Sequence, residues 1–283
     1  MVADEEERVV FWIDHMERSY ELLARMALYP VVECGEPFGS IPQAAKAANV
    51  EMLFSETKLG GMFERIFFIR ESLVDDIIAV GRTMNERGWV LKIEEGYRTR
   101  DMQTALGRAP AVFDLIVRTC IRECRGATPP PELVQRRAMC LVANYPKQAS
   151  HLFGAAVDVS VFRRDDGTEV SRGKPYLEMS EYTPMQSPFV SEQEQANRIE
   201  ITQLMEGRGL LHYPGEFWHY NKGDGLYQMV NKTGIAGKYG AVDWDPVTNK
   251  VSPITDDLSP FMSREQIIPE LESAMRRLAG QPQ

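Results

Sequence analysis

The sequence predicts an α+β protein, because helical and strand patterns follow one another without a regular βαβ repeat. Two observations carry this expectation. Residues 5–28 place apolar side chains at helical spacing, whereas GAAVDVSVF at 154–162 alternates with a period of two. Further stretches of both kinds alternate irregularly along the chain. This order favours a sheet packed against separate helices.

The composition is that of an ordinary soluble globular protein, with 283 residues, 43% of them hydrophobic, and a formal net charge of −9. Lysine and arginine are scattered, so we expect neither nucleic acid nor a membrane as a partner. No apolar run approaches the roughly 20 residues of a membrane-spanning helix. The acidic start MVADEEERVV lacks the features of a secretory signal, which predicts a cytoplasmic protein.

The length allows one large domain, and we expect a single domain over 1–283. It is predicted to consist of an N-terminal helical extension (1–60), a core (61–230) and a C-terminal extension (231–283). The two extensions are expected to wall the functional cleft or to mediate self-association, in which case the protein is a homo-oligomer.

Helices are predicted from apolar periodicity and end signals. The first, residues 5–28, contains His15, which we expect to be structural or solvent-facing. Glycine and proline between residues 30 and 60 predict loops and short pieces. Gly88, Pro269 and Gly280 suit helix ends. Further helices are predicted at 71–87, about 110–125, about 131–143, from 193 to Gly207 or Gly209, and at 269–280.

Three strands are predicted, at 89–100, 154–162 and 212–222. In the second strand Val157 and Val159 point one way, while Asp158 points the other. A carboxylate in an apolar alternation is costly to bury unless a cation meets it. Asp158 is therefore a candidate metal ligand.

Histidines on both sides of this aspartate suggest which metal it would bind. Catalytic zinc sites use three protein ligands, commonly histidines and a carboxylate, and leave a fourth position open. His151, Asp158 and His219 form such a set, with His212 as an alternative ligand. The sequence thus predicts Zn²⁺ as a cofactor.

A hydrolytic zinc site also needs a base that is not a ligand, to take a proton from the attacking water. Glu216 precedes His219 by three residues. In a regular strand these two side chains would face opposite ways, so a bend near Phe217 and Trp218 must turn Glu216 inward.

The cysteines offer a second, weaker candidate site. Cys120 and Cys124 would share one face of a helix, which is compatible with a metal or redox pair. Without a C-x-x-C motif, we expect buried free thiols instead.

The candidate residues resemble a known family. The motifs are H-x-x-G-x-A-x-D, made by His151, Gly154, Ala156 and Asp158, and E-x-W-H, made by Glu216, Trp218 and His219. They resemble the zinc D-alanyl-D-alanine peptidases, most closely the VanX-type dipeptidases and more distantly the VanY-type carboxypeptidases. E-G-Y-R at 95–98 is similar to the family's D-G-Y-R, and the similarity extends over about 62–222.

The resemblance implies a fold and a mechanism. The fold would be that of the hedgehog and D-Ala-D-Ala peptidase group, with a central antiparallel sheet that carries the zinc between flanking helices. The activity would be hydrolysis of a D-Ala-D-Ala-type peptide, with Glu216 as general base and Arg98 polarising the scissile carbonyl. A fixed guanidinium suits that role. The alternatives are a carboxypeptidase on longer peptidoglycan stem peptides and a non-catalytic zinc-bearing binding module.

Two departures from the family pattern concern the substrate. The family reads S-x-H, whereas Ala149 stands two residues before His151. VanX-type enzymes also carry an aspartate that holds the substrate's free amine, and the matching stretch 176–185 has only Glu178 and Glu181. We expect one of these glutamates to bind the ammonium of a small peptide substrate.

Overall fold

A five-stranded sheet forms the centre of the computed structural model, which describes residues 4–280. Its strands run in the order β2 (Met52–Phe54), β4 (Trp89–Glu95), β5 (Ala156–Arg163), β7 (His219–Asn221) and β6 (Leu211–His212). The outer strand β2 is parallel to β4, and the other neighbours are antiparallel. The α+β class is confirmed.

The sheet is mixed rather than antiparallel as expected. Between β2 and β4 the chain passes through helix α3 (Glu71–Glu86), which packs against β4. Such a helical crossover returns the chain in the same direction and so makes a parallel pair. Two small antiparallel sheets lie outside the centre: β1 (Phe38–Ser40) with β3 (Phe68–Arg70), and β8 (Val242–Asp245) with β9 (Lys250–Pro253).

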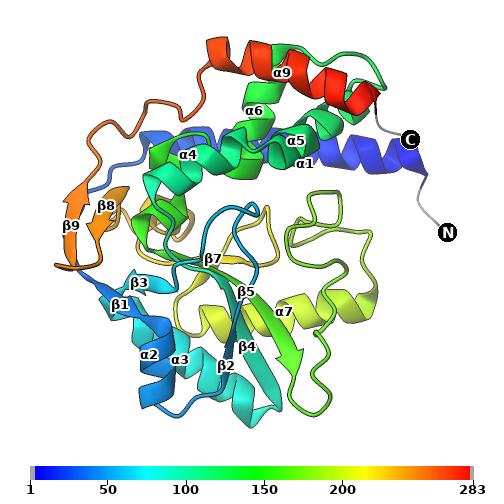
Figure 1. Cartoon of the computed structure of the whole chain (residues 1–283). Helices are drawn as coiled ribbons and strands as arrows, with labels where there is room; N and C mark the ends of the chain where they lie inside the picture. The colour runs from blue at the N-terminus through cyan, green and yellow to red at the C-terminus, as the bar shows by residue number, and fades with distance from the viewer. Residues whose placement is uncertain (1–3, 281–283) are drawn as a thin grey trace.

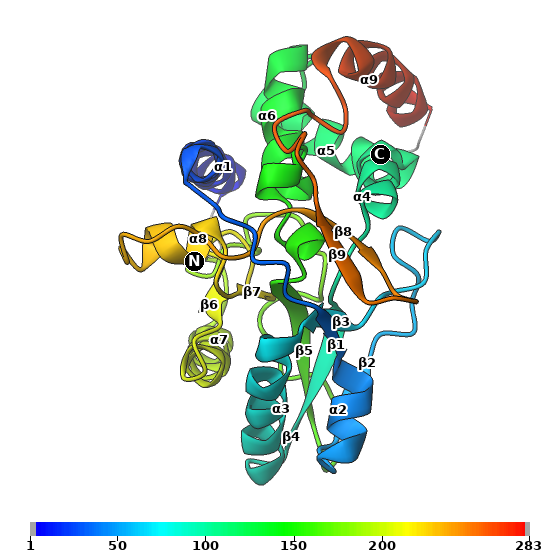
Figure 2. The same ribbon diagram turned by 90° about the vertical axis from the view of Figure 1, so that its left-hand side faces the viewer.

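Helices gather at one end of the sheet. Figure 1 shows α1 (Glu5–Leu28), α4 (Arg100–Arg108), α5 (Pro110–Glu123), α6 (Pro131–Val142) and α9 (Arg264–Ala279) together above the strands. Figure 2, turned by 90°, shows the same layer still above the strands, and α1 packs directly on α6. The remaining helices are α2 (Ile41–Ala47), α7 (Glu192–Glu206) and α8 (Gly225–Val230).

Most predicted helices form within a few residues of their expected ends, because local caps fix them. Asp4 accepts a hydrogen bond from the backbone N–H of Glu7 at 2.8 Å at the start of α1. Gly88 follows α3 with φ of +74°, the left-handed conformation that glycine adopts without a Cβ penalty. Helix α9 begins at Arg264, so Pro269 lies inside the helix and not in its first turn. Helix α4 was not predicted.

Two of the predicted strands are shorter than expected. Strand β4 ends at Glu95, and Arg98 lies beyond it. Residues 212–222 contain the last residue of β6, a turn and the whole of β7. This turn is the predicted bend before His219.

The register of the central sheet brings polar residues together. Asp158 on β5 is paired with Glu95 on β4 and with His219 on β7. Side chains of directly paired residues lie on the same face of a sheet. The predicted alternation of β5 therefore places Asp158 between Glu95 and the candidate ligand His219 on the neighbouring strands.

Within residues 4–280, none of the helices combines the length and the apolar character that crossing a membrane requires. The ends of the two predicted extensions, residues 1–3 and 281–283, lie outside the described residues, as does the beginning of the acidic start. The division into extensions and core stays a prediction.

Candidate metal centre and active site

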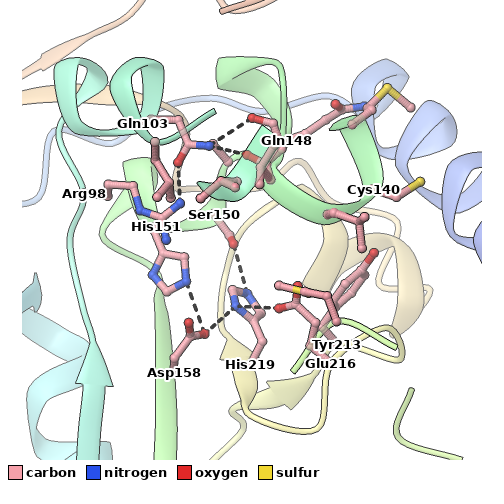
Figure 3. Close-up of a pocket in the computed structure, with 18 of the residues that line it drawn as sticks. Arg98, Gln103, Cys140, Gln148, Ser150, His151, Asp158, Tyr213, Glu216 and His219 are labelled. Carbon is pink, nitrogen blue, oxygen red and sulfur yellow. Dashed lines mark hydrogen bonds and ion pairs between the residues drawn. The ribbon is translucent and has the colours of Figure 1, made fainter. Parts of the chain in front are cut away.

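Three predicted ligands converge on one face of the sheet. Oδ1 of Asp158 lies 3.2 Å from Nε2 of His151 and 2.9 Å from Nδ1 of His219, as Figure 3 shows. One donor atom from each residue lies within 4.8 Å of the others, and all three side chains are buried. We call these residues the His-Asp-His triad.

The donor set of this triad fits zinc. Tetrahedral Zn²⁺ with bonds of about 2.0–2.1 Å holds its ligand atoms about 3.3 Å apart, close to the two observed separations. Burial disfavours the charged forms of His151 and Asp158. Their mutual attraction nevertheless raises the pKa of His151 and holds the pKa of Asp158 well below its usual range. The site is thus built around a buried carboxylate that attracts positive charge.

Backbone geometry orients His151. Its Nδ1 lies 2.8 Å from the carbonyl oxygen of Gly96, which leaves Nε2 free to face Asp158. Gly96 has no room for a side chain, because a Cβ there would approach the carbonyl oxygen of Ile66 to 2.8 Å. Gly154 follows the 3₁₀ turn Ser150–Phe153 with φ of +64°. The glycines of both motifs are therefore steric requirements of the site.

Other side chains hold the remaining triad atoms. Tyr176 donates a hydrogen bond to Oδ2 of Asp158 at 2.9 Å, and Oγ of Ser150 lies 3.0 Å from Nε2 of His219. The serine that contacts the second histidine is thus one residue later than in the family's S-x-H pattern. Neither Tyr176 nor Ser150 was predicted as a site residue. Tyr176 lies in a turn-rich segment without periodicity, so the sequence offers no pattern that would reveal it.

Glu216 lies in the turn between β6 and β7. Its Oε2 lies 3.9 Å from Nδ1 of His219, and the side chain lines the same cavity as the triad. Burial raises the pKa of Glu216 to about 7. Two buried arginines fix this turn, because Arg172 donates to the carbonyl oxygen of Phe217 at 3.0 Å and Arg198 stacks on its ring.

Arg98 is held by neighbouring side chains. Its Nε and Nη2 donate to the two oxygens of Glu95 at 2.9 and 2.7 Å, and its Nη1 donates to Oε1 of Gln103 at 2.5 Å. Burial disfavours the charge, but Glu95 raises the pKa of Arg98. Arg98 also lines the cavity, so a fixed cation stands in the same chamber as the triad. Glu95 was not predicted as a site residue, although it opens the E-G-Y-R motif.

The triad, Arg98 and Glu216 line one cavity of about 200 Å³. It lies between the sheet and the helical layer, and Figure 3 shows Cys140 and Gln148 on the helical side, across from the triad. Leu23 and Met26 of α1 contribute to its wall. The expectation that an extension walls the cleft therefore agrees with the position of α1.

Two other residues that were predicted for the site, His212 and Glu181, pair with side chains outside the triad. His212 pairs with Glu206 at 2.6 Å and is not part of the metal-ligand cluster found in residues 4–280. Glu181 is engaged by Arg8 at 2.7 Å and by Arg122 at 2.8 Å. The carboxylate of Glu181 is thus already neutralised by two guanidinium groups.

Glu178 and the cysteines complete the set of predicted residues. Leu177 and Met179, on either side of Glu178, both line the cavity, whereas Glu178 itself is half-buried beside it. All four cysteines are free thiols, but only Cys120 and Cys140 are buried as expected, whereas Cys124 is half-buried and Cys34 is exposed.

Comparison with known proteins agrees with this arrangement. The family model described as D-ala-D-ala dipeptidase, Peptidase_M15, matches residues 108–234. This range contains all three triad residues and Glu216. This part of the chain is similar to the D-alanyl-D-alanine dipeptidases. The resemblance to these peptidases is thereby confirmed.

Two curated members of the peptidase family are similar to this chain. A D-alanyl-D-alanine dipeptidase of Enterococcus faecium is 30% identical over 87 residues, which are 31% of this chain and 43% of that protein. One of Enterococcus faecalis is 28% identical over 94 residues, 33% of this chain and 46% of that protein. The similarity thus spans less than half the length of either relative.

A solved structure is also similar at a distance. The structure titled "Structure of the LdcB LD-carboxypeptidase reveals the molecular basis of peptidoglycan recognition" shares 18% sequence identity. The match covers 73% of this chain and 77% of that one, with a TM-score of 0.35. A score at this level supports no conclusion about the fold or the substrate.

Proposed function

We propose that this chain is a zinc-dependent peptidase that hydrolyses a short D-Ala-D-Ala-type peptide. The observation that carries the proposal is the convergence of His151, Asp158 and His219 in a cavity that also holds Glu216. The match of residues 108–234 to the dipeptidase family supports the same reaction. Zinc in such a site polarises the scissile carbonyl and lowers the pKa of water.

Glu216 is proposed as the general base. Its carboxylate lies 3.9 Å from His219, and it is not needed as a third ligand because Asp158 already lies between the two histidines. A base works best when its pKa is near the working pH, and burial raises the pKa of Glu216 in that direction. Glu216 would accept the proton of the attacking water and pass it to the leaving amine.

Arg98 is proposed to stabilise the oxyanion that develops on the scissile carbonyl. Glu95 and Gln103 each engage part of its guanidinium group, so the side chain is held without reorganisation when charge develops. A guanidinium has five N–H donors, and these partners engage three of them. The other two donors remain for the substrate.

The free amine of a dipeptide needs a carboxylate partner. Between the two candidates, Glu178 is proposed for this role because it lies beside the cavity, whereas the carboxylate of Glu181 is bound by two arginines. The observation about Glu181 favours the second candidate function, a carboxypeptidase that accepts a longer, acylated peptide. A zinc-bearing binding module is the third alternative, and the presence of Glu216 and Arg98 argues against it.

A substrate comparison tests these alternatives. The purified protein, loaded with zinc, is incubated with D-Ala-D-Ala, N-acetyl-D-Ala-D-Ala and a pentapeptide that ends in D-Ala-D-Ala, and released D-Ala is measured. A dipeptidase cleaves the free dipeptide and loses its preference over the acetylated form in Glu178→Gln. Preferential cleavage of the acetylated or longer peptide identifies a carboxypeptidase. Absence of cleavage in protein that holds one zinc per chain contradicts the enzyme proposal.

A further inference from the structure

The cavity is much more apolar than a D-Ala-D-Ala site requires. Beyond the polar groups described above, its wall is built by aliphatic and thioether side chains of three helices, which we call the apolar chamber: Leu106 of α4, Val112, Leu115 and Ile116 of α5, and Met139 and Leu141 of α6. None of these six carries a charge. The chamber opens directly onto the triad, because the same cavity contains both.

The chamber presents more apolar wall than two methyl groups can cover. An apolar cavity of about 150 Å³ in a protein stays dry and binds benzene, and the whole cavity, with the triad and the chamber together, is about 200 Å³. A substrate with only methyl side chains would leave the chamber walls without contacts. Such a complex would be less stable, because uncontacted apolar atoms lose their dispersion attraction. The chamber therefore matches a branched aliphatic or aromatic group.

A polar atom at the chamber wall indicates how the bound chain is held. Gln148 is 6% exposed and lines the cavity, and its Nε2 donates to the carbonyl oxygen of Leu23 at 3.0 Å. Its Oε1 is buried without a hydrogen-bond partner among the described residues. Buried acceptors normally have partners. An uncharged amide N–H of a bound peptide would supply one, whereas a buried ammonium would lack a carboxylate there.

We propose that the apolar chamber receives a side chain larger than methyl from one of the two residues that flank the scissile bond. This inference rests on the proposed peptidase function and specifies its substrate class: short peptides with a branched aliphatic or aromatic residue beside the cleaved bond. Val112 and Leu115 determine this selectivity. They are half-buried, lie three residues apart and share one face of α5.

Two series of dipeptides test the proposal, D-Xaa-D-Ala and D-Ala-D-Xaa, with Ala, norvaline, Leu, Phe, norleucine or Lys as Xaa. In one series kcat/KM should rise at least about tenfold from Ala to Leu or Phe, since each buried methylene contributes about fourfold. Norleucine should be preferred to Lys, which has a similar length and a charge. If kcat/KM is the same for every Xaa in both series, the proposal is overturned.

Variants of α5 assign the effect to the chamber. Leu115→Trp fills it and should bring the Leu-to-Ala ratio of kcat/KM close to one. Ile121→Phe is the matched control, because Ile121 is half-buried on the same helix but does not line the cavity. It should keep the wild-type ratio. An unchanged ratio in Leu115→Trp shows that the selectivity arises elsewhere and overturns the proposal.

A binding measurement separates failure of this proposal from failure of the peptidase function. Benzene should raise the Tm of the wild type and of Ile121→Phe by about 2 °C or more, and should not raise that of Leu115→Trp. If no peptide is cleaved, the peptidase function fails, and this measurement alone decides whether the chamber binds apolar groups. Absence of a benzene effect in the wild type contradicts the chamber.

Discussion

Asp158 and His219 face each other across the paired strands β5 and β7, with 2.9 Å between Oδ1 and Nδ1. A second imidazole, that of His151, approaches the same oxygen at 3.2 Å. One carboxylate oxygen thus lies between two imidazole nitrogens. This relationship makes the metal content of the protein the first quantity to measure.

Replacement of either histidine should remove the metal. His151→Ala and His219→Ala should each lower zinc from about one per chain to well below that value, because three-ligand sites tolerate little loss. His212→Ala is the matched control, since His212 pairs with Glu206 outside the triad. Elemental analysis after dialysis measures the metal. Zinc retained in His151→Ala and lost in His212→Ala would contradict the ligand set.

Glu216→Gln should separate metal binding from turnover. Glutamine keeps the size of the side chain but cannot accept the proton of water. We expect normal zinc content and a kcat that falls by about two to four decades. The same substitution at the surface residue Glu200 serves as control. Turnover in Glu216→Gln equal to that of the wild type would favour a binding module.

Arg98 and Glu95 should contribute to folding and to catalysis in different ways. Arg98→Ala leaves the buried carboxylate of Glu95 without its main partner, and the free energy of unfolding should fall by about 3 kcal/mol or more. The double variant Arg98→Ala/Glu95→Gln removes that charge and should recover most of the stability. Denaturant unfolding and kinetics are measured on all three proteins. The double variant should still show low kcat with little change in KM, because the oxyanion forms only in the transition state. Recovery of kcat together with stability would make Arg98 purely structural.

Arg198 should stabilise the fold although burying its charge is costly. Its guanidinium donates to the carbonyl oxygens of Arg172 and Pro184 and stacks on Phe217. Arg198→Met leaves these carbonyl groups buried without donors, so we expect a loss of about 3 kcal/mol or more in the free energy of unfolding. Arg87→Met removes a half-exposed ion pair with Glu200 and should change it by less than about 1 kcal/mol. The free energies of unfolding are measured in urea. Equal losses in Arg198→Met and Arg87→Met would show that the buried Arg198 is dispensable.

His15 should make the protein sensitive to acid. It lies buried in α1, where desolvation lowers its pKa to about 4. The unfolded chain takes up this proton near pH 6.5, but the folded chain resists it, so the free energy of unfolding falls as the pH drops from about 6.5 to 4. His15→Gln should reduce that fall by up to about 3 kcal/mol at pH 4. Parallel unfolding curves from pH 7 to pH 4 for both proteins would contradict this role.

The sequence allowed the main elements and the convergence of the His-Asp-His triad to be predicted, because both are visible in local patterns. Alternation of β5 placed Asp158 opposite its apolar neighbours, and the two motifs contain Gly96 and Gly154, where the structure leaves no room for a side chain. The mixed sheet was not predictable in this way. Strand β2 has only three residues, and it pairs with β4, which lies far from it in the sequence. Tyr176 was not predicted for the same reason. Its hydrogen bond to Asp158 joins a turn to a strand, and no local pattern shows such a contact.

Helix α1 lies outside the segment that matches the dipeptidase family, yet Leu23 and Met26 on this helix form part of the cavity wall. The triad and part of the cavity wall thus come from separate stretches of the polypeptide. Over evolutionary time, one stretch can diverge while the other keeps its chemistry. A chimera that carries the first helix of a homologue on this core would separate two quantities. It would show whether a preference among peptides can change while the rate of peptide hydrolysis stays the same.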